Sequence, residues 1–135
     1  MPVDPTLAGR SFGPTAPYDV TEERIAAFAA ATGTPRAVGD PAPATFPIVI
    51  AFEAMTALMQ DPSVGIELHR VVHGEQRFAY TRPVVPGDVL SAVLTVDTLR
   101  SIAGTDIIGT TSALVDPRGD LVCTAKATLV HRGEA

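Results

Sequence analysis

The sequence predicts one α+β domain in which a long antiparallel sheet is wrapped around a central hydrophobic helix. Two observations predict this class. Residues 45–60 are apolar around most of a helical circumference, and a helix of that kind belongs inside a protein. From residue 69 onward the apolar residues recur at every second position, which is the period of a strand with one buried face. A sheet curled around the helix is the economical way to bury both elements.

Length and composition limit the class of protein. The chain has 135 residues, so we expect residues 1–135 to form a single domain, with flexible ends at 1–7 and 133–135. Ten basic and fifteen acidic residues give a net charge of −5 without basic clusters, which argues against a nucleic-acid partner or an anionic membrane surface. No apolar run is long enough for a membrane span, and no secretory leader is expected. With a single cysteine, the chain is expected to work in the cytoplasm.

A short helix is expected over residues 22–32. Thr21 is placed to cap its N-terminus, and Glu22 in the first turn suits the positive end of the helix dipole. Gly33 is placed to end the helix. A short strand is expected just before it, near residues 16–20.

The central helix is expected over residues 45–60, with Pro47 in its first turn, where a missing N–H costs least. Four strands are expected over 69–80, 88–100, 105–116 and 120–132. Short turns between long strands predict an antiparallel meander. A meander of this kind leaves open strand edges and one sheet face, so a partner subunit is expected to cover them.

One strand is unusually polar, because it carries His73, Glu75 and Gln76 in close succession. With its neighbours it resembles the MaoC-like hydratase/dehydratase branch of the hot-dog superfamily. The resemblance covers roughly residues 8–132. It rests on Ala44-Thr45-Phe46-Pro47, on Val72-His73-Gly74-Glu75-Gln76-Arg77-Phe78, and on Arg82-Pro83 with Pro86-Gly87-Asp88. The chain is most similar to the non-catalytic subunit of mycobacterial-type (3R)-hydroxyacyl-ACP dehydratases and to the N-terminal half of fused MaoC-like enzymes.

Active members of this family carry the motif Ser/Thr-Gly-Asp-x-Asn-Pro-x-His. Its Asp and His form the acid/base pair that adds or removes water across the double bond of an acyl thioester. The matching stretch of this chain runs from Phe28 to Arg36, and Thr34 stands where the Asp is expected. No His occurs between Phe28 and Phe46, and the loop is shorter than is usual in the family. We therefore expect no intact catalytic residue in this chain.

The candidate substrate-binding or subunit-seam residues lie on the central helix and on the polar strand. They are Thr45, Phe46, Ile50, Glu53, Met55, Met59, His73, Gly74, Glu75 and Gln76. Ile50, Met55 and Met59 are expected to line an acyl tunnel. His73 and Glu75 are placed on one strand face and interpreted as a structural network or seam in preference to ligand contacts. Gly74 is interpreted as a bulge or a close backbone approach.

Several residues leave two interpretations open. Thr45-Phe46-Pro47 either offers backbone N–H groups to a thioester carbonyl or only caps the helix. Arg82 and Arg100 could contact a cofactor phosphate or belong to the surface, and His131 is expected to be solvated. Cys123, on an apolar strand face, is interpreted as a core residue. Because the histidines lack a cluster of further ligands, no metal site is expected.

The resemblance implies a subunit of an (R)-specific 3-hydroxyacyl-thioester dehydratase or enoyl hydratase. This chain would bind the acyl chain and complete a hetero- or homodimer, while a partner subunit supplies the Asp/His dyad. The substrate would be carried on CoA or acyl carrier protein, without a further cofactor. One alternative is a homodimeric acyl-CoA thioesterase that uses Glu53, although pairing of Glu53 with Arg77, His73 or another polar group at the seam is the simpler interpretation. The other alternative is a non-enzymatic acyl-thioester binding protein.

Overall fold

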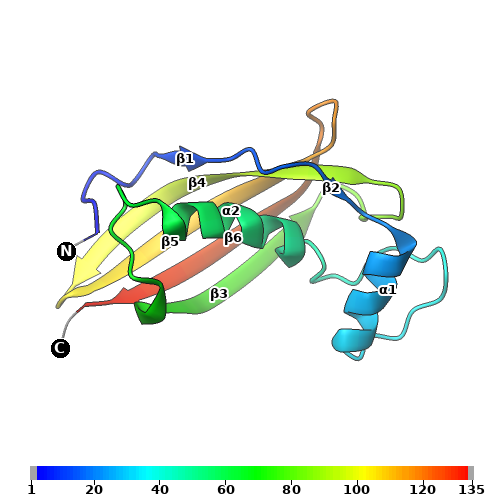
Figure 1. Ribbon diagram of the computed structural model, residues 1–135, viewed down its shortest axis with the longest axis horizontal. Coiled ribbons are helices and arrows are strands. Elements are labelled where there is room, and N and C mark those ends of the chain that lie inside the picture. The colour runs from blue at the N-terminus through cyan, green and yellow to red at the C-terminus, as the bar shows by residue number, and fades with distance from the viewer. Residues whose placement is uncertain (1–2, 134–135) are drawn as a thin grey trace.

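A long antiparallel sheet with one helix across its face forms the body of the molecule (Figure 1). The computed structural model describes residues 3–133. In chain order the elements are β1 (Ser11–Phe12), β2 (Tyr18–Asp19), α1 (Glu22–Ala31), α2 (Ile48–Gln60), the 3-10 helix η1 (Leu68–Arg70), β3 (Val71–Tyr80), β4 (Val89–Ile102), β5 (Thr105–Val115) and β6 (Leu121–Arg132). The α+β class and the hot-dog arrangement are confirmed.

The strand order is β1-β4-β5-β6-β3, and β2 also pairs with β4. The expected meander is confirmed for β4, β5 and β6. The first hairpin turns at Ala103-Gly104, where both residues have positive φ (51° and 82°), as the twist of a tight hairpin requires. Since β1 and β2 pair with Leu94–Thr95 and Val89–Leu90 of β4, the first half of that edge is covered. The other edge is β3, which is paired only with β6 among the described strands.

The core lies between α2 and the inner face of the sheet. Ile50, Ala54 and Leu58 are fully buried on α2. Leu94 on β4 and Leu129 on β6 are buried in the same core. Burying a leucine or isoleucine side chain stabilises a fold by about 1.5–3 kcal/mol, so this layer provides most of the driving force. Small residues on the sheet let the helix lie close to it; these are Ala92, Ala125 and Ala127.

Helix α1 stands beyond one end of the sheet (Figure 1). Its predicted cap is confirmed, because the Arg24 N–H donates to the Thr21 hydroxyl oxygen (3.1 Å). Its buried side is tied to the start of α2 by an edge-to-face contact between the rings of Phe28 and Phe46, whose centroids are 5.4 Å apart. This contact fixes the two ends of the loop that joins the helices.

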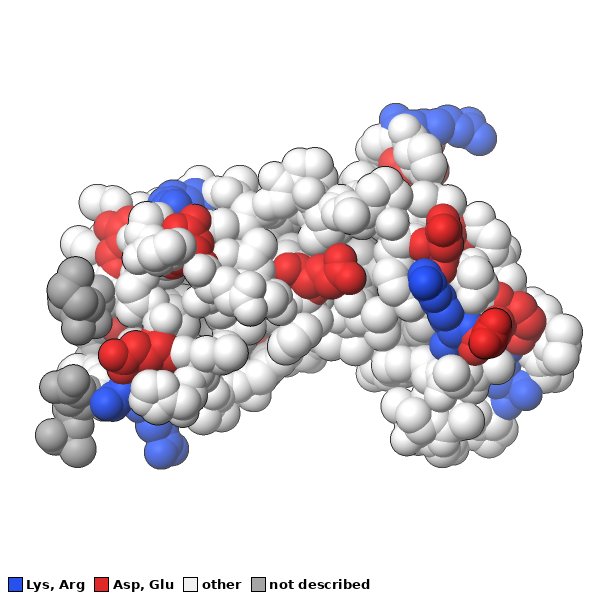
Figure 2. All heavy atoms as spheres, viewed as in Figure 1, with Lys and Arg blue, Asp and Glu red and all other residues white. Residues whose placement is uncertain are grey.

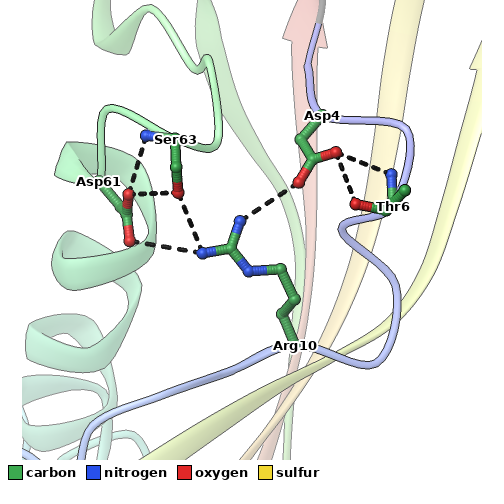
Figure 3. A network of polar contacts seen from close by, with 5 residues as sticks. All are labelled: Asp4, Thr6, Arg10, Asp61 and Ser63. Atoms are coloured by element: carbon green, nitrogen blue, oxygen red, sulfur yellow. Dashed lines mark hydrogen bonds and ion pairs between the residues drawn. The ribbon is translucent and has the colours of Figure 1, made fainter.

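The N-terminal segment differs from the expectation that residues 1–7 are flexible. Val3 and Leu7 are buried, and Arg10 lies between Asp4 (3.3 Å) and Asp61 (3.6 Å) at the end of α2, as Figure 3 shows. The segment is therefore packed against the body, because its apolar side chains belong to the buried core. Residues 1, 2, 134 and 135, which belong to the expected flexible ends, lie outside the described residues.

Candidate functional site

A β-bulge at Gly74 changes which face of the sheet the side chains of the polar strand β3 point to. His73 pairs with Leu129 and Glu75 pairs with Thr128, so the register shifts by one residue at Gly74. The interpretation of Gly74 as a bulge is confirmed. The expectation that His73 and Glu75 share a face is wrong, because an extra residue in a strand sends the following side chains to the opposite face.

The two faces hold separate polar pairs. On the helix side, the ring Nε2 of His73 lies 3.0 Å from Gln76 Oε1. On the outer side, Arg77 Nε donates to Glu75 (2.6 Å) beside a shallow polar groove that also includes Lys126. Both partners of this ion pair are well exposed, and exposed pairs of this kind contribute only about 0–1 kcal/mol.

An apolar groove of about 150 Å³ opens between α2 and the start of β3. It is lined by Phe52, Met59, Leu68, Val71, His73 and Leu129. The structure thus brings together Met59 and His73, two of the candidate residues. Phe52 and Leu68 are 49% and 57% exposed, so large apolar side chains lie at the surface beside this groove.

A second groove of about 390 Å³ lies where β3 ends and α2 begins; we call it the loop groove. It is lined by Ala42, Ala44, Tyr80, Thr81, Arg82, Pro83 and Val84. The Tyr80 hydroxyl donates to the Ala44 carbonyl and so ties the edge strand to the segment before α2. Burial, and then the nearby Cys123, raise the pKa of Tyr80 to about 12, so its hydroxyl remains a donor at neutral pH.

Arg82 is engaged by the turn that follows β3. Its two terminal nitrogens donate to the carboxylate of Asp88 at 2.9 and 3.1 Å, and this pairing raises the pKa of Arg82. Because one carboxylate already binds both terminal nitrogens, this guanidinium is poorly placed to bind a phosphate as well. The geometry therefore favours a structural role for Arg82. Arg100 is an exposed residue of β4.

The start of α2 has few free donors. The N–H groups of Phe46, Ile48 and Val49 donate to carbonyls in the preceding turn, at distances of 2.9–3.1 Å. The side chain of Thr45 is exposed, and the ring of Phe46 is buried against Tyr18 and Phe28. This arrangement favours a structural helix start over a site that binds a thioester carbonyl.

The remaining helix candidates divide between core and surface. Ile50 and Met55 are fully buried, and neither lines the apolar groove. Glu53 is exposed, and within residues 3–133 it makes no hydrogen bond or ion pair. The partners named for it are engaged elsewhere, because Arg77 binds Glu75 and His73 lies against Gln76.

The loop between α1 and α2 is closed by Arg36, whose side chain is only 5% exposed. Its terminal nitrogens contact both carboxylate oxygens of Glu22, at 2.5 and 2.8 Å, and its NH2 group also donates to the Asp40 carbonyl. Hydrogen bonds from Arg36 and from the Gly39 N–H lower the pKa of Glu22 to about 2. The Asp40 carboxylate accepts the Ala37 N–H (3.0 Å) and is therefore also used within the loop.

The buried polar residue that sequence reasoning missed is His131. It is 4% exposed, so the expectation that it is solvated is wrong. Its position two residues after the buried Leu129 places it on the inward face of β6, and this periodicity is the signal that could have identified it. Phe52, Leu68, Val71 and Tyr80 were also missed as groove residues.

Two further expectations concern reactive groups. Cys123 is fully buried, and burial raises the pKa of its thiol to about 11, which suppresses the thiolate and favours a core role. Within residues 3–133 no three His, Cys, Asp or Glu side chains lie close enough to hold a metal ion. In the same part of the chain no helix is long and apolar enough to cross a membrane.

The fold and the grooves beside its open edge define a protein of the MaoC-like dehydratase class within the hot-dog superfamily. The chain belongs to the family described as the FAS1-like dehydratase domain region, which matches residues 6–125.

Known proteins support this assignment. The chain is 44% identical to a UPF0336 protein of Clavibacter michiganensis over 147 aligned positions that cover 99% of each chain. It matches a chain of the C-terminally truncated HadBC (3R-hydroxyacyl-ACP dehydratase) complex of Mycobacterium tuberculosis with a TM-score of 0.79 and 25% identity, covering 92% of this chain and 96% of that one. An (R)-hydratase from A. caviae, 20% identical, shares the fold (TM-score 0.65, covering 93% and 98%).

The alignment with the Clavibacter protein is longer than this chain, which has 135 residues. That relative therefore has inserted residues that this chain lacks.

Proposed function

We propose that this chain is the non-catalytic subunit of an (R)-specific 3-hydroxyacyl-thioester dehydratase or enoyl hydratase. It binds part of the acyl chain and completes a dimer, while a partner hot-dog subunit supplies the Asp/His dyad. The substrate is a thioester of CoA or acyl carrier protein in the cytoplasm, and no further cofactor takes part.

The observation that carries the proposal is the loop between α1 and α2. Active family members place their dyad there, whereas this loop has Thr34, whose hydroxyl is hydrogen-bonded to that of Thr32 (2.9 Å), and the Arg36–Glu22 pair. Reversible hydration needs an acid and a base within reach of the same substrate. The residues that line the apolar groove and the loop groove include no carboxylate at all. A scaffold of this kind fits a subunit whose chemistry is performed by another chain.

The surface supports a partner at the β3 edge. Figure 2 shows most charged side chains of this face gathered toward its two ends, while the middle, over α2, is uncharged except for an acidic patch. Phe52, Leu68 and Val72 are exposed apolar residues beside the β3 edge, which pairs only with β6 among the described strands. An open strand edge next to apolar side chains is suited to pairing with a second sheet. The chain of the HadBC complex, whose fold this one shares, is itself described in a complex.

The proposal is tested by hydration of crotonyl-CoA and of a longer enoyl-CoA with the purified chain alone. We expect no turnover above background, because neither the apolar groove nor the loop groove contains an acid/base pair. Addition of a hot-dog subunit with an intact Asp and His should bring activity. Robust hydration by this chain alone would show that it has its own active site and would overturn the proposal.

A thioesterase function remains the second candidate because Glu53 is exposed and unpaired among the described residues. Such a carboxylate could attack a thioester or activate water. Glu53→Gln should then abolish cleavage of an acyl-CoA in a folded protein, and Glu75→Gln, on the opposite face of the sheet, should not. If the unaltered chain cleaves no acyl-CoA, or if Glu53→Gln cleaves it normally, this second function is excluded.

A further inference from the structure

His131 connects the sheet to the short helix η1. Its Nε2 accepts the backbone N–H of Glu67, the residue just before η1, at 3.0 Å. An imidazole nitrogen that accepts a hydrogen bond carries no proton, so the proton of the neutral ring lies on Nδ1. Nδ1 is 3.5 Å from a carboxylate oxygen of Asp106 on β5. Asp106 in turn accepts the Ser101 hydroxyl (2.5 Å). Within residues 3–133 Nδ1 makes no hydrogen bond, so the ring is held to the neighbouring segment through the Glu67 N–H.

Helix η1 forms one wall of the apolar groove. Leu68 lies within it and Val71 follows it directly, and both line the groove opposite Phe52 and Met59. The helix has only three residues and no side-chain cap, so it has little stability of its own. The position of this wall therefore depends on what holds η1 against β6.

Two groups hold η1 to the end of β6. One is the His131–Glu67 hydrogen bond, which is partly buried: His131 is buried and Glu67 is exposed. The other joins Arg70 to the carbonyl of Gly133 (3.1 Å), and Arg70 also pairs with Glu67 (2.5 Å) within the segment itself. The histidine bond is the one that fixes the start of the helix, directly before Leu68.

We propose that His131 is a positioning residue that sets the width of the apolar groove and, through it, the length of acyl tail that the chain accepts. By holding Glu67, it places the Leu68 side chain over the groove. The inference rests on the proposed function for the nature of the ligand, an acyl thioester. The attachment of η1 itself does not depend on that function.

Three variants test the proposal. His131→Leu removes the acceptor, and His131→Gln offers an amide oxygen that can accept the same N–H. Glu67→Pro removes the donor and leaves the buried imidazole untouched, but it also removes the ion pair between Glu67 and Arg70. Compared with Glu67→Gln, which loses only the ion pair and keeps the N–H, it decides the matter if His131→Leu fails to fold. His69→Leu is the matched control, because His69 is an exposed residue of η1.

The first readout is hydrogen exchange of the backbone amides of residues 67–71. We expect exchange to accelerate about fivefold or more in His131→Leu, and in the amides that remain in Glu67→Pro, since a partly buried hydrogen bond is lost. His131→Gln and His69→Leu should exchange like the unaltered chain. Unchanged exchange in both His131→Leu and Glu67→Pro would overturn the positioning role.

The second readout is the dissociation constant for butanoyl-, octanoyl- and dodecanoyl-CoA, measured by calorimetry with the full chain. The unaltered chain should prefer one length, and this preference should shrink severalfold in His131→Leu and Glu67→Pro but not in His131→Gln or His69→Leu. An unchanged length preference despite faster exchange would overturn the role in specificity. If the unaltered chain binds none of the three thioesters, the proposed function fails, and the specificity role fails with it. The exchange data still decide whether His131 holds η1.

Discussion

At Arg36 one side chain closes the loop that precedes the central helix. Its guanidinium is nearly buried and binds the Glu22 carboxylate with two hydrogen bonds, and it also binds the Asp40 carbonyl. A buried guanidinium needs such partners, because an unpaired charge in this position is costly. The loop that corresponds in sequence to the family's hydratase motif is thus occupied by a structural ion pair.

The ion pair predicts a pH-dependent loss of stability. Glu22→Gln removes the negative charge and should lower the melting temperature at neutral pH. The pKa of Glu22 is about 2 in the folded chain, below its ordinary value of 4.5, so its contribution is present above about pH 4.5 and is lost as the pH falls toward 2. Thermal unfolding between pH 2 and 7 should show the two proteins converging at low pH.

Glu23→Gln is the matched control, because Glu23 is an exposed neighbour in the same helical turn. It should unfold like the unaltered chain at every pH. A difference between Glu22→Gln and the unaltered chain that stays constant down to pH 2 would contradict the assigned role of the Glu22 charge.

Some of these residues could be predicted from the sequence and others could not. The cap at Thr21 and the replacement at Thr34 were readable, because each depends on neighbours a few positions away. The Glu22–Arg36 pair joins residues that are separated by the end of a helix and an irregular loop, so no periodicity indicates it. The same holds for Arg82, because its pairing with Asp88 depends on how the intervening turn folds.

Among the elements, the edge strand β3 shows the limit of a pattern-based interpretation. Its existence and bounds were predicted closely, as 69–80 against the observed Val71–Tyr80. The face of the sheet to which each side chain points was not predicted correctly, because the bulge at Gly74 reverses the face of every residue that follows it in the strand. The tunnel residues on α2 were also predicted only in part, since a helix that is apolar nearly all round does not reveal which side faces the sheet.

Two glycines should respond differently to alanine. A Cβ at Gly74 would lie 3.5 Å or more from its nearest neighbours, so Gly74→Ala should change stability by less than about 1 kcal/mol. A Cβ at Gly13 would lie 2.6 Å from the Ala92 carbonyl oxygen, and Gly13 has a φ of 104°. Gly13→Ala should therefore destabilise the fold by more than about 1 kcal/mol. Urea unfolding of both variants measures this difference, and equal effects would contradict it.

Alanine substitutions of the two methionines of α2 should also have different effects. Met55 is fully buried in the core, so Met55→Ala should lower the free energy of unfolding by about 2–5 kcal/mol. Met59 lines the apolar groove, so Met59→Ala should additionally weaken binding of octanoyl-CoA by about threefold or more. Calorimetric titration of the folded fraction of each variant compares them. Weaker binding in Met55→Ala than in Met59→Ala would place the acyl chain elsewhere.

On the scale of the whole molecule, the two sheet edges are unequal. The first half of one edge is covered by β1 and β2, whereas β3 carries exposed apolar and polar side chains along an edge that no other described strand pairs. A fold whose second edge is open along a whole strand is suited to association through that strand. The apolar groove lies beside that edge, so a partner subunit would help to enclose it.

Association through β3 should be sensitive to charge. Val72→Asp places a carboxylate on the exposed edge and should shift the protein toward the monomer, because its desolvation against a second sheet is costly. Val38→Asp is the control, since Val38 is 88% exposed in the loop before α2. Light scattering after size-exclusion chromatography gives the molar mass of each. An unchanged assembly in Val72→Asp would remove β3 as the contact.

The central claim is that this chain completes an active site whose acid and base belong to another subunit. Its most direct test is the initial rate of crotonyl-CoA hydration while this chain is titrated into a fixed amount of a co-purifying hot-dog subunit with an intact Asp and His. We predict no rate for this chain alone and a rate that rises to a plateau near equimolar mixture. A rate that grows in proportion to this chain without limit, or one that its addition leaves unchanged, would contradict the claim.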